Sequence, residues 1–237
     1  MNKLRIAGIE REQKMIKRTA LVTGGSRGIG KAIVQKLKSE GYEVYAPCRI
    51  EMDLSLPESV EKYCASVRDI YFDVIVNNAG INDINDIEKI TDEELNGMME
   101  VNLKSPIRLL RALTPKMKEK HYGRIVNIGS IWSMVSKRGR TVYSVTKHGI
   151  HGLTKTLAVE LAEYNILVNT VCPGFTLTEL TKKNNTLEQI SEISREIPLT
   201  RMAEPEEIAN VVCYLVSEQN TYLTGQIIAV DGGYTSR

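Results

Sequence analysis

The stretch Thr23–Gly30, TGGSRGIG, joins two segments of opposite character. The preceding TALV is a short apolar run typical of a buried strand, and GKAIVQKLKSEG has the apolar spacing of an amphipathic helix that ends at Gly41. Glycine inside a helix is destabilising, so four glycines within eight residues need a reason. One reason is a turn in which Gly24, Gly28 and Gly30 let the backbone approach a phosphate at the helix N-terminus. The alternative is a tight turn without a ligand.

Apolar runs and amphipathic segments alternate along the rest of the chain. The expected strands span 19–25, 42–49, 72–80, 123–130, 166–174 and 225–233, and the expected helices span 30–41, 56–70, 91–113, 141–164 and 204–218. The strands are apolar throughout, which indicates a parallel sheet covered on both faces. We therefore predict an α/β fold, a doubly wound parallel sheet in three α/β/α layers of the Rossmann type. We expect one domain over 17–237, preceded by an N-terminal extension at 1–16.

Composition narrows the class of protein. The chain has 237 residues, 42% of them hydrophobic, and a net charge of +2, which favours neither nucleic-acid nor membrane binding. The first residues lack the apolar segment of a secretory signal, so we expect a cytoplasmic protein. Four scattered cysteines are expected to be reduced, small core side chains. His148 and His151 are spaced as metal ligands on a helix are, but no carboxylate or cysteine motif accompanies them, so we predict no metal site.

Further motifs follow the glycine turn in a fixed order. They are NNAG at Asn77–Gly80, a strand-end serine at Ser130, YSVTK at Tyr143–Lys147 and PGFTLTEL at Pro173–Leu180. Together with Thr23–Gly30, they resemble the short-chain dehydrogenase/reductase family from about Lys17 to the C-terminus. The resemblance implies four catalytic residues, Ser130, Tyr143, Lys147 and Asn102, and an assembly into dimers or tetramers. It implies a nicotinamide cofactor held by Gly24, Ser26, Arg27, Gly28, Ile29, Gly30, Arg49, Asp53, Leu54, Asn78, Ala79, Gly80, Tyr143, Lys147, Pro173, Gly174, Thr176 and Thr178.

The predicted chemistry centres on Tyr143 and Lys147, which lie on one helix face because they are four residues apart. A phenol titrates near pH 10, and we expect the neighbouring ammonium to lower the pKa of Tyr143 so that it can exchange a proton. Ser130 ends a predicted strand, where its hydroxyl can stabilise charge on a substrate oxygen. By resemblance, Asn102 supports a water that relays protons through Lys147. Taken singly, each motif has a structural alternative. Tyr143 and Lys147 could lie on an exposed helix face, Ser130 could cap a strand end, and Asn102 could be a buried amide that pairs with the backbone.

Two arginines bear on which nicotinamide cofactor is used. Arg27 lies in the glycine turn and Arg49 ends the second predicted strand, and a guanidinium suits the 2′-phosphate of NADP(H). We therefore favour NADP(H), with NAD(H) as the alternative because Glu51 is close enough to hold a ribose hydroxyl. One departure from the family lies between Arg49 and Asp53, where its usual helix has no room. Asp53 still resembles the family's adenine-side aspartate, in a more open adenosine pocket.

Substrate specificity is expected from two segments, the loop 131–142 and the stretch after Gly174. The loop carries Lys137, Arg138 and Arg140, which suit an anionic substrate, although a solvated basic loop is the commoner case. The polar segment 176–201 is expected to be irregular, a candidate lid. We predict interconversion of a small carbonyl compound and a secondary alcohol, similar to that of 3-oxoacyl-carrier-protein reductases. The alternatives are a sugar or polyol dehydrogenase of the same family, a nucleotide-sugar epimerase or dehydratase, and a catalytically silent NADP-binding regulator.

Overall fold

A computed structural model describes residues 17–236, and the extension predicted at 1–16 lies outside them. Its six strands form one parallel sheet in the order β2-β1-β3-β4-β5-β6. The strands are β1 (Thr19–Val22), β2 (Glu43–Tyr45), β3 (Val74–Asn77), β4 (Gly123–Ile128), β5 (Ile166–Pro173) and β6 (Ile227–Val230). The α-helices are α1 (Gly28–Ser39), α2 (Pro57–Ser66), α3 (Asp92–Met99), α4 (Ser105–Lys120), α5 (Thr141–Leu161), α6 (Glu179–Asn184), α7 (Leu187–Arg195) and α8 (Pro205–Val216).

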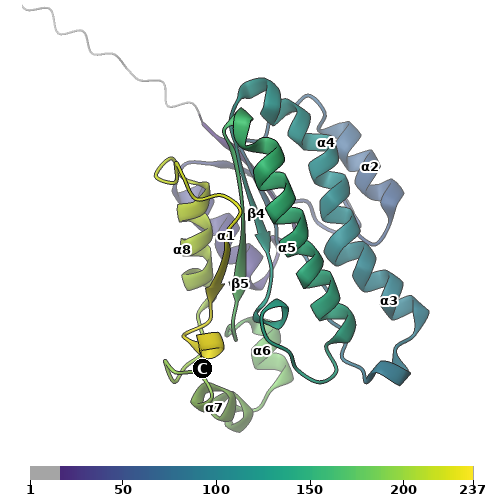
Figure 1. The fold of residues 1–237 in the computed structure, drawn as a ribbon, viewed down its shortest axis with the longest axis vertical. Coiled ribbons are helices and arrows are strands. Elements are labelled where there is room, and N and C mark those ends of the chain that lie inside the picture. Colours follow the sequence, from purple (N-terminus) through teal and green to yellow (C-terminus); the bar gives the residue numbers. More distant parts are fainter. Residues whose placement is uncertain (1–16, 237) are drawn as a thin grey trace, which may run out of the picture.

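Helices cover both faces of the sheet. Figure 1 shows α1 and α8 together on one side of the strands and α2, α4 and α5 on the other, with α6 and α7 near the C-terminus. Successive side chains of β1 point to opposite faces of the sheet, and each face has its own hydrophobic core. Ala20 and Val22 pack toward α1 and α8, and Leu21 packs toward α2 and α4. All three are fully buried. The predicted three-layer α/β/α fold is confirmed.

The order of the strands fixes where a ligand can bind. The chain runs from β1 to β2 on one side and then returns to β3 on the other side of β1. In sheets of this kind, the reversal opens a crevice at the carboxyl ends of the two central strands. The glycine turn Thr23–Gly30 follows β1 at that edge, directly before α1.

The long predicted helix 91–113 is interrupted. Its capping box is present, because Thr91 accepts a hydrogen bond from the Glu94 backbone and Glu94 accepts one from the Thr91 backbone. Between α3 and α4, however, one π-helical turn spans η2 (Glu100–Lys104). A π turn inserts an extra residue into a helix, which hydrophobic spacing does not reveal.

Two other expectations were wrong. The segment 176–201 is not irregular, since it forms α6 and α7, and Thr178 and Thr186 cap these helices with their side chains. Three cysteines are buried as expected, but Cys48 is exposed because the chain turns at the sheet edge directly after β2. Across 17–236, no helix combines the length and apolar character needed to cross a bilayer.

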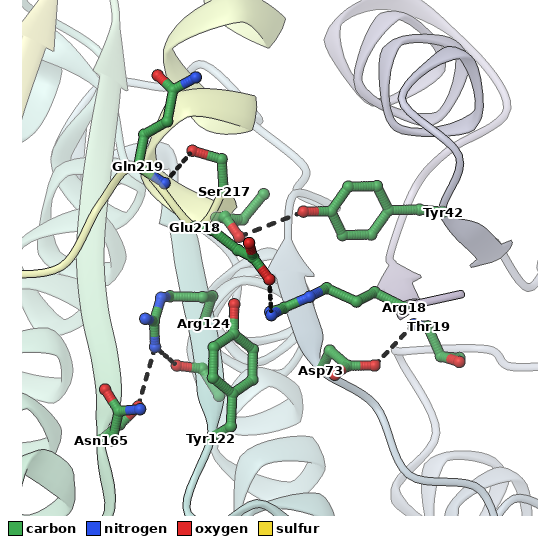
Figure 2. A network of polar contacts seen from close by, with 12 residues as sticks. Arg18, Thr19, Tyr42, Asp73, Tyr122, Arg124, Asn165, Ser217, Glu218 and Gln219 are labelled. Atoms are coloured by element: carbon green, nitrogen blue, oxygen red, sulfur yellow. Dashed lines mark hydrogen bonds and ion pairs between the residues drawn. The ribbon is translucent and has the colours of Figure 1, made fainter. Parts of the chain in front are cut away.

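The opposite, amino edge of the sheet carries a compact polar cluster, shown in Figure 2. The Tyr122 ring lies between two guanidinium groups, with Arg18 4.0 Å and Arg124 4.4 Å from its centroid. Arg124 is buried and donates to the Asn165 carbonyl oxygen over 2.9 Å, while Arg18 pairs with Glu218. The Tyr122 hydroxyl is buried and has no hydrogen-bond partner within the described part of the chain. This edge is therefore held by ring–cation contacts rather than by the hydroxyl.

Two substitutions at Tyr122 separate the ring from the hydroxyl. Tyr122→Phe keeps both cation contacts and removes a buried unpaired donor, so we expect unfolding free energy to stay equal or rise by about 1 kcal/mol. Tyr122→Leu loses both contacts, each worth about 0.5–2 kcal/mol, and we expect a clear loss of stability. Urea unfolding measures both variants. A Phe variant less stable than the Leu variant would contradict this account.

Candidate active site

The glycine turn requires the absence of side chains. Gly24 and Gly28 have φ of 65° and 54°, the left-handed region that glycine adopts without strain. A Cβ on Gly30 would lie 2.2 Å from the Gly24 carbonyl oxygen, so α1 packs against the turn only with glycine there. The positive φ angles at Gly24 and Gly28 and the close packing at Gly30 thus account for these glycines. The absence of side chains also leaves the first turn of α1 open toward the crevice.

Thr23 and Asn78 join the carboxyl ends of β1 and β3. The Thr23 hydroxyl oxygen accepts hydrogen bonds from the backbone N–H groups of Asn78 and Ala79, each over 3.0 Å. In return, the Asn78 side-chain amide donates to the carbonyl oxygens of Thr23 and Gly24 over 3.0 and 3.1 Å. Asn78 therefore braces the two strands and holds the turn in place.

A cleft of about 800 Å³ opens from this turn along the carboxyl edge of the sheet. All eighteen residues that the resemblance associates with the cofactor line it: Gly24, Ser26, Arg27, Gly28, Ile29, Gly30, Arg49, Asp53, Leu54, Asn78, Ala79, Gly80, Tyr143, Lys147, Pro173, Gly174, Thr176 and Thr178. Thr178, the N-cap of α6, faces the glycine turn, because a Cβ on Gly28 would lie 3.3 Å from its methyl group. The volume and the open backbone suit an extended dinucleotide.

Three of the four predicted catalytic side chains line the same cleft: Ser130, Tyr143 and Lys147. Lys147 is only 4% exposed and donates to the Ile128 carbonyl oxygen over 2.7 Å. Its ammonium nitrogen lies 5.6 Å from the centre of the Tyr143 ring. Ser130 follows β4, and its hydroxyl accepts a hydrogen bond from the Trp132 backbone over 3.2 Å.

Asn102 does not line the cleft but lies behind it, in the π turn. Its amide is paired on both sides with the Ile81 backbone, each bond 2.8 Å, and it donates to the Thr146 hydroxyl over 3.2 Å. A Cβ on Gly80 would lie 3.3 Å from the Asn102 side-chain oxygen and 3.5 Å from the Lys147 nitrogen. Asn102 and Lys147 therefore approach each other across a glycine that must remain small.

The electrostatics correct one expectation. We expected Lys147 to lower the pKa of Tyr143, but burial raises that pKa above its usual value. A hydrogen bond with Ser130 and the charge of Arg140 oppose this rise, and Lys147 is not among the opposing causes. Burial lowers the pKa of Lys147 itself to about 8. The buried ammonium group of Lys147 thus lowers stability, and its hydrogen bond to the Ile128 carbonyl oxygen offsets part of this effect.

At the adenosine end of the cleft, Arg49 is exposed and pairs with Asp53 over 2.9 Å. Asp53 also accepts hydrogen bonds from the Ser55 backbone and hydroxyl, which lower the pKa of its carboxyl group. The carboxylate of Glu51 is turned to the Cys48 backbone, 2.7 Å away. The acidic groups of this segment are therefore bound within it, while the Arg27 side chain has no ion pair among the described residues.

Sequence reasoning did not single out a polar cluster behind Ser130. The Ser133 hydroxyl donates to the Ser130 carbonyl oxygen and lies 2.9 Å from the His151 ring nitrogen. The Cys172 thiol lies 3.5 Å from the same nitrogen. Its three members come from a loop, α5 and β5, so no local spacing announces the cluster. The His151 ring therefore makes polar contacts with Ser133 and Cys172 and is not simply an exposed side chain on a helix.

Comparisons with known proteins agree with this geometry. A family model described as enoyl-(acyl carrier protein) reductase matches residues 45–235, and one described as short chain dehydrogenase matches 18–51. A 3-oxoacyl-[acyl-carrier-protein] reductase of Vibrio cholerae is 36% identical over 236 residues, covering 91% of this chain and 96% of that protein. The chain belongs to the short-chain dehydrogenase/reductase family and is an oxidoreductase.

Two solved structures add to this. The aldohexose dehydrogenase of Thermoplasma acidophilum superposes with a TM-score of 0.87 at 29% identity, covering 93% of this chain and 95% of that one. The structure of ElxO with NADP bound superposes with a TM-score of 0.86 at 28% identity, covering 94% of this chain and all of that one. Together with the relatives, they support a nicotinamide cofactor.

The buried charge of Lys147 predicts a pH-dependent stability. Its folded pKa, about 8, lies below the usual lysine value of 10.5, so the unfolded chain binds the extra proton and stability rises as pH increases between these values. At pH 7, replacing Lys147 by Met removes a penalty of up to about 3 kcal/mol at the cost of one hydrogen bond. We expect Lys147→Met to be the more stable protein at pH 7, with the difference shrinking toward pH 10.

Unfolding by urea at several pH values measures this difference. Lys155→Met, which removes an exposed lysine from the same helix, is the matched control and leaves the pH profile unchanged. A Lys147→Met variant that runs parallel to the wild type at every pH would refute the buried-charge account.

Proposed function

We propose that this chain is an NADPH-dependent reductase that converts a carbonyl group into a secondary alcohol, with chemistry like that of the 3-oxoacyl-carrier-protein reductases. The observation that carries the proposal is the convergence of Ser130, Tyr143 and Lys147 on a cleft that begins at the glycine turn. The similarity to a relative bearing that name supports the choice of reaction.

The residues of the cleft fit a dinucleotide. The open first turn of α1, with no Cβ on Gly24, Gly28 or Gly30, would hold the pyrophosphate, because backbone N–H groups and the helix N-terminus favour an anion. Asn78 would keep this cradle at its distance from β3. When bound, the nicotinamide supplies the hydride, or accepts it in the reverse reaction.

The chain's own side chains handle the substrate oxygen. In the proposed role, the Ser130 hydroxyl donates a hydrogen bond to the carbonyl oxygen, and Tyr143 delivers the proton to it. The raised pKa keeps Tyr143 a neutral phenol at neutral pH, which is the form that a proton donor requires. The ammonium of Lys147 lies beneath, and Asn102 fixes the backbone around Ile81 beside it.

The preference for NADPH is part of the proposal. Arg27 and Arg49 both line the adenosine end of the cleft, and a guanidinium binds a phosphate with two parallel hydrogen bonds. Arg49 already pairs with Asp53, so Arg27 is the one of these two arginines that has no ion pair among residues 17–236. The turn of Glu51 toward Cys48 argues against a carboxylate that holds the ribose hydroxyl of NADH.

A second candidate is a sugar or polyol dehydrogenase. The superposition on an aldohexose dehydrogenase favours it, because the same serine, tyrosine and lysine would serve the oxidation of an alcohol. In that direction Tyr143 must accept a proton, and its raised pKa leaves less of the phenolate that could do so near neutral pH.

The first test is Tyr143→Phe, which removes the proton donor and keeps the ring. We expect NADPH-dependent reduction of a panel of ketones to fall by about 10²- to 10⁴-fold, the usual contribution of a general acid. NADPH binding, followed by nucleotide fluorescence, is expected to persist. Tyr164→Phe, in the short 3-10 turn that follows α5, is the matched control. Full activity in Tyr143→Phe would remove the proposed mechanism.

The cofactor preference is tested at Arg27 and Arg49. Charge-assisted hydrogen bonds contribute about 1.5–3 kcal/mol, so we expect Arg27→Gln and Arg49→Gln each to lower kcat/KM for NADPH about tenfold or more. The values for NADH are expected to stay within about twofold, since NADH lacks the 2′-phosphate. Lys31→Gln, an exposed change on α1, serves as control. Equal losses with both cofactors would count against the assignment of these arginines.

A further inference from the structure

The three basic residues of the loop 131–142 have different surroundings. Arg138 forms two hydrogen bonds with the Asp86 carboxylate, of 2.7 and 2.8 Å, on the outer surface. The Lys137 ammonium lies over the rings of Trp132 and Phe175, 5.8 and 6.0 Å from their centres. Both cations therefore have interactions of their own, and neither lines the cleft.

Arg140 differs from both. It lines the cleft together with Ser130 and Tyr143, and it is half-buried. Within residues 17–236, its guanidinium has no hydrogen bond and no ion pair. Burial lowers the pKa of Arg140, because its charge is partly removed from water. A cation held in this way is ready to bind an anion.

No acidic side chain of the cleft compensates Arg140. Among the described residues, the acidic ones that line the cleft are Asp53 and Glu179. Asp53 pairs with Arg49, and Glu179 is exposed in the first turn of α6. Lys147, on the substrate side of the cleft, donates to a carbonyl oxygen, so among the described residues Arg140, from the loop that also supplies Trp132, is the cation there with neither an ion pair nor a hydrogen bond.

The place of Arg140 limits how far the anion lies from the reacting carbonyl. Arg140 directly precedes α5 and stands three residues before Tyr143, about one helical turn away, and both residues line the cleft. An anion on Arg140 therefore lies within a few atoms of the substrate oxygen that Tyr143 would serve. The phosphate of a long carrier arm, many bonds from its acyl carbonyl, does not meet this condition.

One wall of the cleft is apolar and closely packed. The rings of Trp132, Phe175 and Tyr234 meet edge to face, with centroids 5.3 to 6.1 Å apart. Trp132 is only 7% exposed, and both Trp132 and Phe175 line the cleft. Such a wall suits a short carbon skeleton between the carbonyl and the anionic group.

We propose that Arg140 binds the anionic group, a carboxylate or a phosphate, of a small substrate in which that group lies within a few atoms of the reacting carbonyl. The substrate class is thus a short oxo acid or a phosphorylated ketone rather than a carrier-bound acyl chain. This inference rests on the proposed reductase function and names its substrate.

Paired substrates test the charge. Acetoacetate is compared with methyl acetoacetate, and dihydroxyacetone phosphate with dihydroxyacetone, each pair differing in the anionic group. We expect the wild type to prefer one anionic member at least about tenfold in kcat/KM, the value of a charge-assisted hydrogen bond. The pair with the larger preference identifies carboxylate or phosphate. Equal rates within both pairs would overturn the proposal.

Variants assign the preference to one residue. Arg140→Gln is expected to raise KM for the anionic substrate at least about tenfold while KM for the neutral partner stays the same, and Arg140→Lys is expected to restore part of the preference. Lys137→Gln removes the same charge from the same loop and is expected to keep the preference. An equal loss on both members of a pair in Arg140→Gln would make the arginine merely structural and reject the proposal.

A binding measurement separates this inference from the proposed function. Trp132 is the only tryptophan of the chain and lines the cleft, so its fluorescence reports occupancy directly. With NADPH present, titration with butanoate or inorganic phosphate is expected to change this signal in the wild type and not in Arg140→Gln, and butanamide is expected to have no effect. Anion binding without reduction of any carbonyl would refute the reductase while keeping the anion site. Reduction without Arg140-dependent anion binding would do the reverse.

Discussion

Four hydrogen bonds join Thr23 and Gly24 to Asn78 and Ala79 and hold the carboxyl ends of β1 and β3 at a fixed separation. The glycine turn is anchored at its start by this contact, and α1 begins where the turn ends. On the other strand, the same contact sets the course of Ala79 and Gly80, against which Asn102 and Lys147 pack. The contact between the ends of β1 and β3 thus positions both the glycine turn and the side chains proposed to transfer protons.

The two edges of the sheet use buried cations in opposite ways. At the amino edge, Arg18 and Arg124 enclose a tyrosine ring, and Arg124 donates to a carbonyl oxygen, so charge is spread over contacts inside the protein. At the carboxyl edge, Lys147 is almost fully buried with one carbonyl acceptor, and Arg140 has no partner among the described residues. Buried charge without full compensation lowers stability, and at the carboxyl edge it lies where ligands and reacting atoms belong.

The sequence allowed the sheet class, the crevice and the set of cleft residues to be predicted, because these depend on local patterns in a fixed order. The motifs Thr23–Gly30 and Tyr143–Lys147 each predict the conformation of one short stretch of backbone. Side-chain partners from distant segments could not be predicted. Lys147 donates a hydrogen bond to the Ile128 carbonyl oxygen, and burial raises the pKa of Tyr143, which the spacing alone suggested would fall. The distinction between Arg138, with its distant partner Asp86, and Arg140 depends on tertiary structure in the same way.

The π turn at Glu100–Lys104 places an extra residue between two otherwise regular helices. Its amide-bearing member, Asn102, bonds to the Ile81 backbone on both sides. Deleting one residue there to obtain an uninterrupted α-helix would rotate everything after the deletion by about 100° relative to α3, since each residue turns an α-helix by that amount. An engineer who idealises this helix for thermostability would therefore trade the anchoring of Ile81 for regularity, and the irregular turn is best left untouched in any redesign of the scaffold.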